Sequence, residues 1–165
     1  MAKTPGLGSR LLIGGIAGFV ATMAMTSAMR RLHRKLPPEE RYPLPPREIV
    51  DAAVGPHADH APDITITAHF AYGAACGALL AAANPRLAPA SGALAGASIW
   101  LASYMGWIPA FGILAPATDH PLRRNAAMFT AHLAWGWSTA KAIDELTDAR
   151  ASIFAAGPHK DADRS

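Results

Sequence analysis

The chain has 165 residues, of which 51% are hydrophobic and 16% are charged, and its formal net charge at pH 7 is +3. Four stretches that total 87 residues contain no Asp, Glu, Lys or Arg, so all 27 charged residues fall in the other 78 positions. A soluble helical domain distributes charge along the outward faces of its helices, so this segregation argues against a soluble domain. The small net charge also argues against nucleic-acid binding. So does the position of the cationic residues, which flank apolar stretches as they do at membrane surfaces.

The charge-free stretches predict an all-α membrane protein with four transmembrane helices. A helix needs roughly 20 predominantly apolar residues to cross a bilayer. We expect one domain over residues 1–156, followed by a disordered tail at 157–165. The predicted spans are residues 11–29, 64–83, 90–108 and 125–143.

The first span has one alternative interpretation, a cleaved signal peptide. Its apolar core is longer than the roughly 7–15 residues of a signal peptide. The cations Arg30, Arg31, Arg34 and Lys35 follow it at once and act as a stop-transfer flank. We therefore expect a span that is retained.

A Pro-rich extramembrane loop, residues 30–63, follows the first span. Its prolines prevent one continuous helix. Pro46 is suited to begin a short helix over Arg47–Val54, which Gly55 would end. The apolar side of this segment is suited to lying on the membrane surface.

The short connection Asn84–Leu87 predicts that the second and third spans are antiparallel neighbours. Small residues allow close helix approach in lipid, and three pairs of glycines have GxxxG spacing. We expect the third span to end near Trp107, with Pro109–Ala117 forming a kinked extension or a re-entrant turn. The predicted packing glycines are Gly14, Gly18, Gly73, Gly77, Gly92 and Gly96.

The charge distribution leaves the orientation open. Four spans place both termini and the Asn84–Leu87 turn on one side, with seven Lys and Arg residues against eight on the other. The cationic cluster after the first span slightly favours a cytoplasmic first loop.

Four sequence motifs between Pro43 and Ala142 carry a resemblance to a known family. They are Pro43-Leu44-Pro45-Pro46-Arg47 with Ile49 and Asp51, Thr67–Phe70, Gly92–Gly96, and Ala131-His132-Leu133-Ala134-Trp135-Gly136-Trp137-Ser138. In this order they resemble the YagU-like family of small bacterial inner-membrane proteins. The resemblance implies a multi-pass protein of the bacterial inner membrane with a periplasmic first loop, and it implies no activity.

Two histidines lie within predicted spans that run in the same direction. His69 is the sixth residue of the second span and His132 the eighth of the fourth, so both lie roughly 8–11 Å below one membrane surface. They are suited to ligating haem or a divalent metal, or to passing a proton, and Trp135 shares a helix face with His132. The alternative is a pair of neutral histidines that hydrogen-bond between helices.

A second group of histidines and carboxylates lies outside the spans. His57, Asp59, His60 and Asp63 have a spacing that can bind Zn²⁺, and Asp119 and His120 lie on the same side of the membrane. The alternative is a solvated polar loop. Trp100, Tyr104 and Trp107 predict an aromatic belt near a membrane surface, and Trp137 is deep enough for core packing.

No catalytic signature is present, neither G-x-S-x-G, H-E-x-x-H, a P-loop nor a dinucleotide-binding fingerprint. The lone Cys76 excludes an intramolecular disulfide and is expected to be a small packing residue. The sequence thus favours a structural or accessory membrane protein whose partners are the bilayer and either a second copy or another membrane protein. The alternatives are a haem- or metal-binding protein and a small transporter or channel component.

Overall fold

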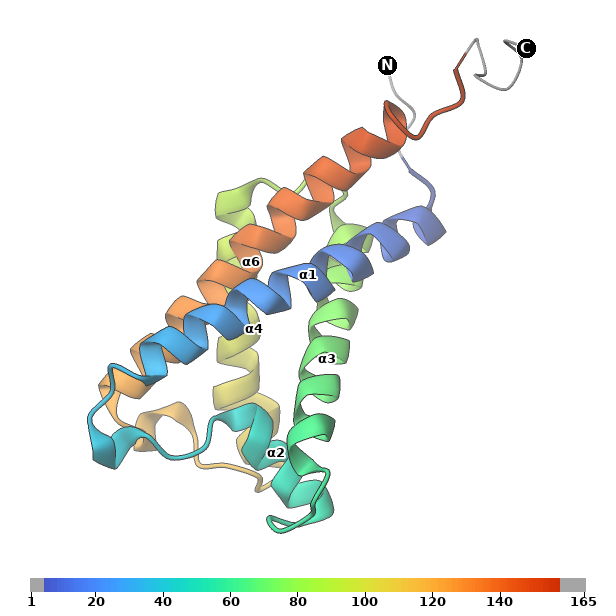
Figure 1. Ribbon diagram of the computed structural model, residues 1–165. Helices are drawn as coiled ribbons and strands as arrows, with labels where there is room; N and C mark the ends of the chain where they lie inside the picture. The colour runs from blue at the N-terminus through green and yellow to red at the C-terminus, as the bar shows by residue number, and fades with distance from the viewer. Residues whose placement is uncertain (1–4, 158–165) are drawn as a thin grey trace.

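The computed structural model describes residues 5–157, and this part of the chain contains helices and no strand. The all-α prediction is confirmed. The predicted tail at 157–165 lies almost wholly outside the described residues. The four long helices are α1 (Leu7–His33), α3 (Ala61–Ala83), α4 (Pro89–Ala102) and α6 (Leu122–Ala151) (Figure 1).

The central pair of the bundle is α1 and α6, which lie side by side and run in opposite directions (Figure 1). Helix α3 packs on α1, and α4 packs on α6, so the order across the fold is α3, α1, α6, α4. Helices α3 and α4 are antiparallel and joined by a short turn, as expected, but they do not pack on each other. The prediction that they are neighbours is therefore wrong, because each is held by a different central helix.

Two helices, α1 and α3, are long and apolar enough to cross a membrane. The other two are shorter or more polar by the same measure. Helix α4 has 14 residues before its geometry changes, and the charge-free part of α6, residues 125–140, has 16. The structure extends α1 and α6 beyond the predicted spans, α6 by a further eight residues to Ala151.

Backbone contact at glycines holds α1 against α3. A Cβ at Gly14 would overlap the carbonyl oxygen of Gly77, and a Cβ at Gly18 would overlap that of Gly73. The two GxxxG pairs of these helices thus face each other. Such contact needs glycine on both sides, because any side chain would push the helix backbones apart.

A second glycine contact holds α4 against α6. A Cβ at Gly92 would overlap the carbonyl oxygen of Gly136, and one at Gly96 would overlap that of His132. Gly136 was not among the predicted packing residues, although Gly136 and Ala140 have the small-xxx-small spacing that signals such a contact.

The third hydrophobic stretch changes geometry where a break was expected. A π-helix, η2, covers Ser103–Trp107 and contains Gly106 at φ −112° and ψ −105°. A single α-turn, α5 (Ile108–Ala110), follows, and the chain then turns at Gly112 with φ +66°. The segment returns through the 3₁₀ turn η3 (Ala117–Asp119) and packs Ala117 against the cluster around η2.

The Pro-rich segment between α1 and α3 contains the 3₁₀ turn η1 (Pro38–Glu40) and the helix α2 (Pro45–Val54). The helix begins at Pro45, one residue before the predicted Pro46, because both prolines fit its first turn, and it ends at Gly55 with φ +92°. Val50 is 5% exposed, so α2 packs its apolar side against the bundle.

Candidate ligand-binding cavity

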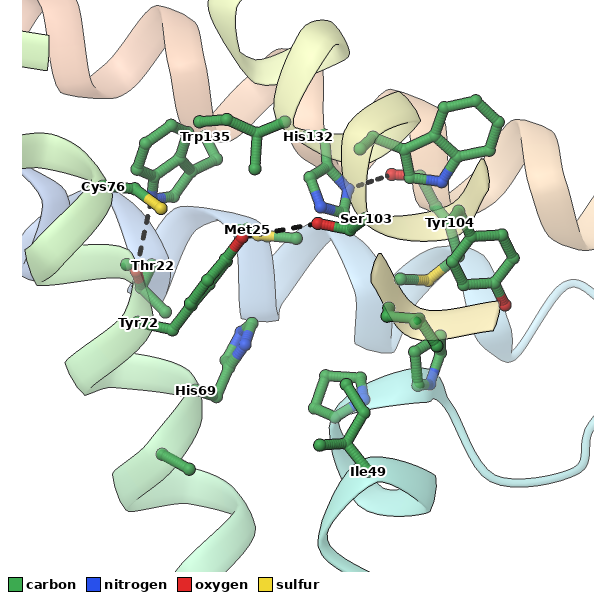
Figure 2. Close-up of a pocket in the computed structure, with 18 of the residues that line it drawn as sticks. Thr22, Met25, Ile49, His69, Tyr72, Cys76, Ser103, Tyr104, His132 and Trp135 are labelled. Carbon is green, nitrogen blue, oxygen red and sulfur yellow. Dashed lines mark hydrogen bonds between the residues drawn. The ribbon is translucent and has the colours of Figure 1, made fainter. Parts of the chain in front are cut away.

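A cavity of ≈ 250 Å³ lies between α3 and the α4–α5 segment, with α1 and α6 behind it and α2 at its loop end (Figure 2). Its walls are mainly apolar, and no Asp, Glu, Lys or Arg is among them. The polar and aromatic side chains in its walls include those of α1 (Thr22), α3 (His69, Tyr72), η2 (Ser103, Trp107) and α6 (His132, Trp135).

The two predicted histidines line this one cavity from different helices. Nδ1 of His132 lies 2.8 Å from the carbonyl oxygen of Met128, one turn earlier in α6. A carbonyl only accepts, so Nδ1 carries the proton and Nε2 of the neutral ring holds a free lone pair. His69 makes no hydrogen bond to another described residue, and its Nε2 is buried without a partner. Among residues 5–157, neither histidine makes a hydrogen bond to another helix, so the helix-bridging contacts that the sequence left as the alternative are not formed there.

A chain of polar groups joins α3 to the π-helix. The hydroxyl oxygens of Tyr72 and Ser103 are 3.3 Å apart (Figure 2). The indole Nε1 of Trp107 donates to Ser103 Oγ at 3.2 Å. Ser103 and Trp107 are four residues apart and so lie on one side of the segment. The bond between Tyr72 and Ser103 is the one side-chain hydrogen bond that joins α3 to the third apolar stretch among residues 5–157.

The cavity opens between α3 and α4. These two helices do not pack on each other, and Tyr72, which lies in one wall, is 45% exposed. Ala68, which also lines the cavity one turn before Tyr72, is exposed as well. The opening therefore lies on the side of the bundle, while α2 closes the end that faces the Pro-rich segment between α1 and α3.

Arg124 holds the loop that carries α2. Its side chain is fully buried, and Nη1 donates to the carbonyl oxygen of Tyr42 at 3.0 Å, while Nη2 donates to that of Pro43. Its guanidinium also lies over the Tyr42 ring and 3.9 Å from Glu48 Oε1 on α2. Arg124 at the start of α6 thus fixes the segment that leads into α2 and places α2 over the end of the cavity.

Burial raises the pKa of Glu48 above its usual value, because desolvation penalises the charged carboxylate. The positive charges of Arg124 and His120 lower this pKa and offset part of the effect, while Asp51 adds to the increase.

The predicted surface metal site is not formed by the described residues. His57, Asp59, His60 and Asp63 are exposed, and no three His, Cys, Asp or Glu side chains of residues 5–157 converge. His120 is engaged elsewhere, because its Nδ1 lies 3.0 Å from the Tyr42 hydroxyl and its Nε2 3.1 Å from the carbonyl oxygen of Ala115.

The aromatic residues differ from the prediction in both places. Tyr104 is 3% exposed and, with Trp100 and Trp107, lines the cavity, so this group does not form a surface belt. Trp137 is 52% exposed and faces outward, whereas Trp135 is 3% exposed and forms part of the core. Nε1 of Trp135 lies 3.3 Å from both Thr22 Oγ1 and the carbonyl oxygen of Gly18, linking α6 to α1.

Three cavity residues, Tyr72, Ser103 and Trp107, were missed in the sequence although each carries a signal. Tyr72 follows His69 by three residues and therefore shares its helix face. Ser103 and Trp107 lie where the glycine and prolines break the third stretch, and π-turns are frequent at functional sites. Arg124 gave no signal, because a cation before an apolar stretch is also the ordinary flank of a membrane span.

No family model, no curated protein and no solved structure matches the chain. The resemblance to the YagU-like family therefore stays a prediction, and the cavity is interpreted from its own geometry.

Proposed function

We propose that the chain is a four-span protein of the bacterial inner membrane, an accessory protein that binds a small lipid-soluble molecule in the cavity between α3 and α4. The motifs shared with the YagU-like family support the location. The observation that carries the proposed binding is the cavity itself, with its apolar walls, two histidines and side opening. Ligand sites in proteins are typically apolar hollows with a few convergent polar groups.

The four-span topology is supported by the alternating direction of the long helices. Both ends of the described chain and the α3–α4 turn lie at one end of the bundle, and α2 and η3 lie at the other (Figure 1). The cationic loop segments and Arg124 lie at the α2 end of the bundle, outside the apolar parts of the helices, as a four-span topology requires.

Cysteine labelling tests this topology. In a Cys76→Ala background, Asn84→Cys and Thr118→Cys should react with a membrane-impermeant maleimide from opposite sides of the membrane, because α4 separates them. If only α1 and α3 crossed, both cysteines would label from the same side, and the four-span proposal would be overturned.

Binding is tested with the tryptophans as reporters. Trp100, Trp107 and Trp135 line the cavity, so a Trp137→Phe background leaves only cavity tryptophans. A brominated C10 hydrocarbon should quench their fluorescence saturably in nanodiscs. Ala68→Phe, which fills the opening, should abolish saturation, whereas Ala71→Phe, at an exposed position of α3 that does not line the cavity, should not. Quenching that rises linearly with membrane concentration of the probe in all variants would overturn the proposal.

A further inference from the structure

The hydrogen-bonding groups of the cavity define the kind of ligand it takes; this inference rests on the proposed binding function. His132 supplies an acceptor, because its Nδ1 proton is used by the Met128 carbonyl and its Nε2 is free. A group that donates a hydrogen bond is therefore the natural partner of this histidine.

The Tyr72–Ser103 pair supplies a donor. Trp107 Nε1 can only donate, so Ser103 Oγ accepts from it. The two hydroxyls share one hydrogen bond between them and have two protons. Whichever hydroxyl donates to the other, one O–H proton remains for a ligand.

The walls carry no charge that would neutralise an ionic ligand. Every lining residue is apolar or neutral, and an unpaired charge is costly to bury. A carboxylate or an ammonium group is therefore disfavoured. A hydroxyl both donates and accepts, so one ligand hydroxyl can pair with the His132 acceptor and with the donor of the Tyr72–Ser103 pair. His69 Nε2, Trp100 Nε1 and the Tyr104 hydroxyl also line the cavity and are buried without a partner among residues 5–157, so polar wall groups remain beyond these two.

We propose that the cavity binds a neutral lipid-soluble alcohol, whose hydroxyl donates to His132 Nε2 and accepts from the Tyr72–Ser103 pair. Both groups line the same cavity, and its volume of ≈ 250 Å³ is below the roughly 300 Å³ at which drug-sized sites begin, so it takes the hydroxyl end and only part of the ligand. The apolar body of the alcohol extends through the opening between α3 and α4.

The test compares 10-bromodecan-1-ol with its methyl ether in the Trp137→Phe protein reconstituted in nanodiscs. The ether has the same apolar body and can accept but not donate, so it leaves His132 Nε2 without a partner. The alcohol should quench saturably with a half-saturation concentration about tenfold below that of the ether, the ratio that one lost hydrogen bond gives. His132→Phe should bring this ratio close to one, because it removes the acceptor that only the alcohol can use. Tyr72→Phe should leave the ratio at about ten, because the alcohol and the ether both accept from the Tyr72–Ser103 pair.

The outcomes separate this inference from the function on which it rests. Saturable quenching by alcohol and ether at equal concentrations in the Trp137→Phe protein overturns the alcohol specificity and leaves binding intact. Quenching without saturation by either probe overturns both. If His132→Phe does not fold, His132→Leu decides, because a ratio that is unchanged without the imidazole contradicts the proposed contact.

Discussion

The guanidinium carbon of Arg124 lies 3.7 Å from the centre of the Tyr42 ring. Tyr42 belongs to the loop before α2 and lies 82 residues before Arg124 in the chain. The Arg124 side chain donates to the carbonyl oxygens of Tyr42 and Pro43 and is fully buried. An arginine fork can serve several acceptors and an aromatic face at once, which a lysine ammonium cannot. The loop conformation therefore depends on this one side chain.

Arg124→Lys should lower the free energy of unfolding by about 2–4 kcal/mol, because the buried loop carbonyls lose donors and a compact charge replaces the stacked one. Thermal unfolding in detergent, followed by circular dichroism, measures the change. The matched control is Arg123→Lys, whose side chain is exposed one residue earlier. Equal melting temperatures for the two variants would contradict the assigned role of Arg124.

Glu48 should make the fold more stable at low pH. Its pKa is raised in the folded state, so folding favours the protonated carboxyl. This contribution is fully present below the pKa of the unfolded chain, near 4.5, and is lost as pH rises through the higher folded pKa. The melting temperature of Glu48→Gln relative to the unaltered protein should therefore rise between pH 4 and pH 7.5.

The control for this prediction is Glu145→Gln, since the Glu145 side chain is 76% exposed on α6. Its difference from the unaltered protein should stay flat over the same range. A relative melting temperature of Glu48→Gln that falls with pH would show that the attraction of Arg124 outweighs desolvation.

Gly14→Ala should separate α1 from α3, because the added methyl would overlap the carbonyl oxygen of Gly77. Overpacking of this kind costs about 1–3 kcal/mol. Gly15→Ala is the matched control, since its Cβ would lie 3.9 Å from the nearest atom, the Ala74 carbonyl oxygen, and alanine favours the helix. Thermal unfolding should thus show a lower melting temperature for Gly14→Ala and no decrease for Gly15→Ala. The reverse order would contradict the contact between Gly14 and Gly77.

Trp135→Phe should lower stability by about 1 kcal/mol, because Thr22 and Gly18 lose the indole N–H that links α6 to α1. Trp137→Phe, two residues later on the outward face, should have almost no effect. Chemical unfolding of both variants in the same detergent measures the difference. Similar losses for the two would indicate that the Trp135 hydrogen bonds contribute nothing.

The helices were predictable from the sequence and their partners were not. Charge-free stretches bounded by cations and prolines locate α1, α3 and α4 within two turns and the start of α6 within one turn, because long apolar stretches free of charge favour helices. The end of α6 lies eight residues beyond its predicted position, because its last turns carry charged residues. The arrangement α3, α1, α6, α4 depends on which glycine faces which. A single sequence does not indicate which helix Gly73 or Gly92 will contact. The expectation that α3 and α4 pack on each other because they are adjacent in the chain was therefore wrong.

The candidate site was predictable in part. Histidines in apolar stretches are costly and so attract attention, and helix rise placed His69 and His132 at similar depth. The cavity that they line arises because α3 and α4 do not pack on each other, which no local pattern indicates. Only the folded backbone brings the side chains of Tyr72 and Ser103 within hydrogen-bond distance. Arg124 is buried because a loop far away in the sequence covers it.

The glycine contacts of α1 with α3 and of α4 with α6 join backbone to backbone, whereas the walls of the cavity are side chains on other faces of the same helices. Assembly and recognition therefore depend on largely different positions, although Gly73 and His132 belong to both sets. Substitutions at Ile99 or Ala68 can change the shape of the cavity while the distances between the packed helices stay the same. A scaffold divided in this way can change what it accommodates during evolution without losing the contacts by which it folds.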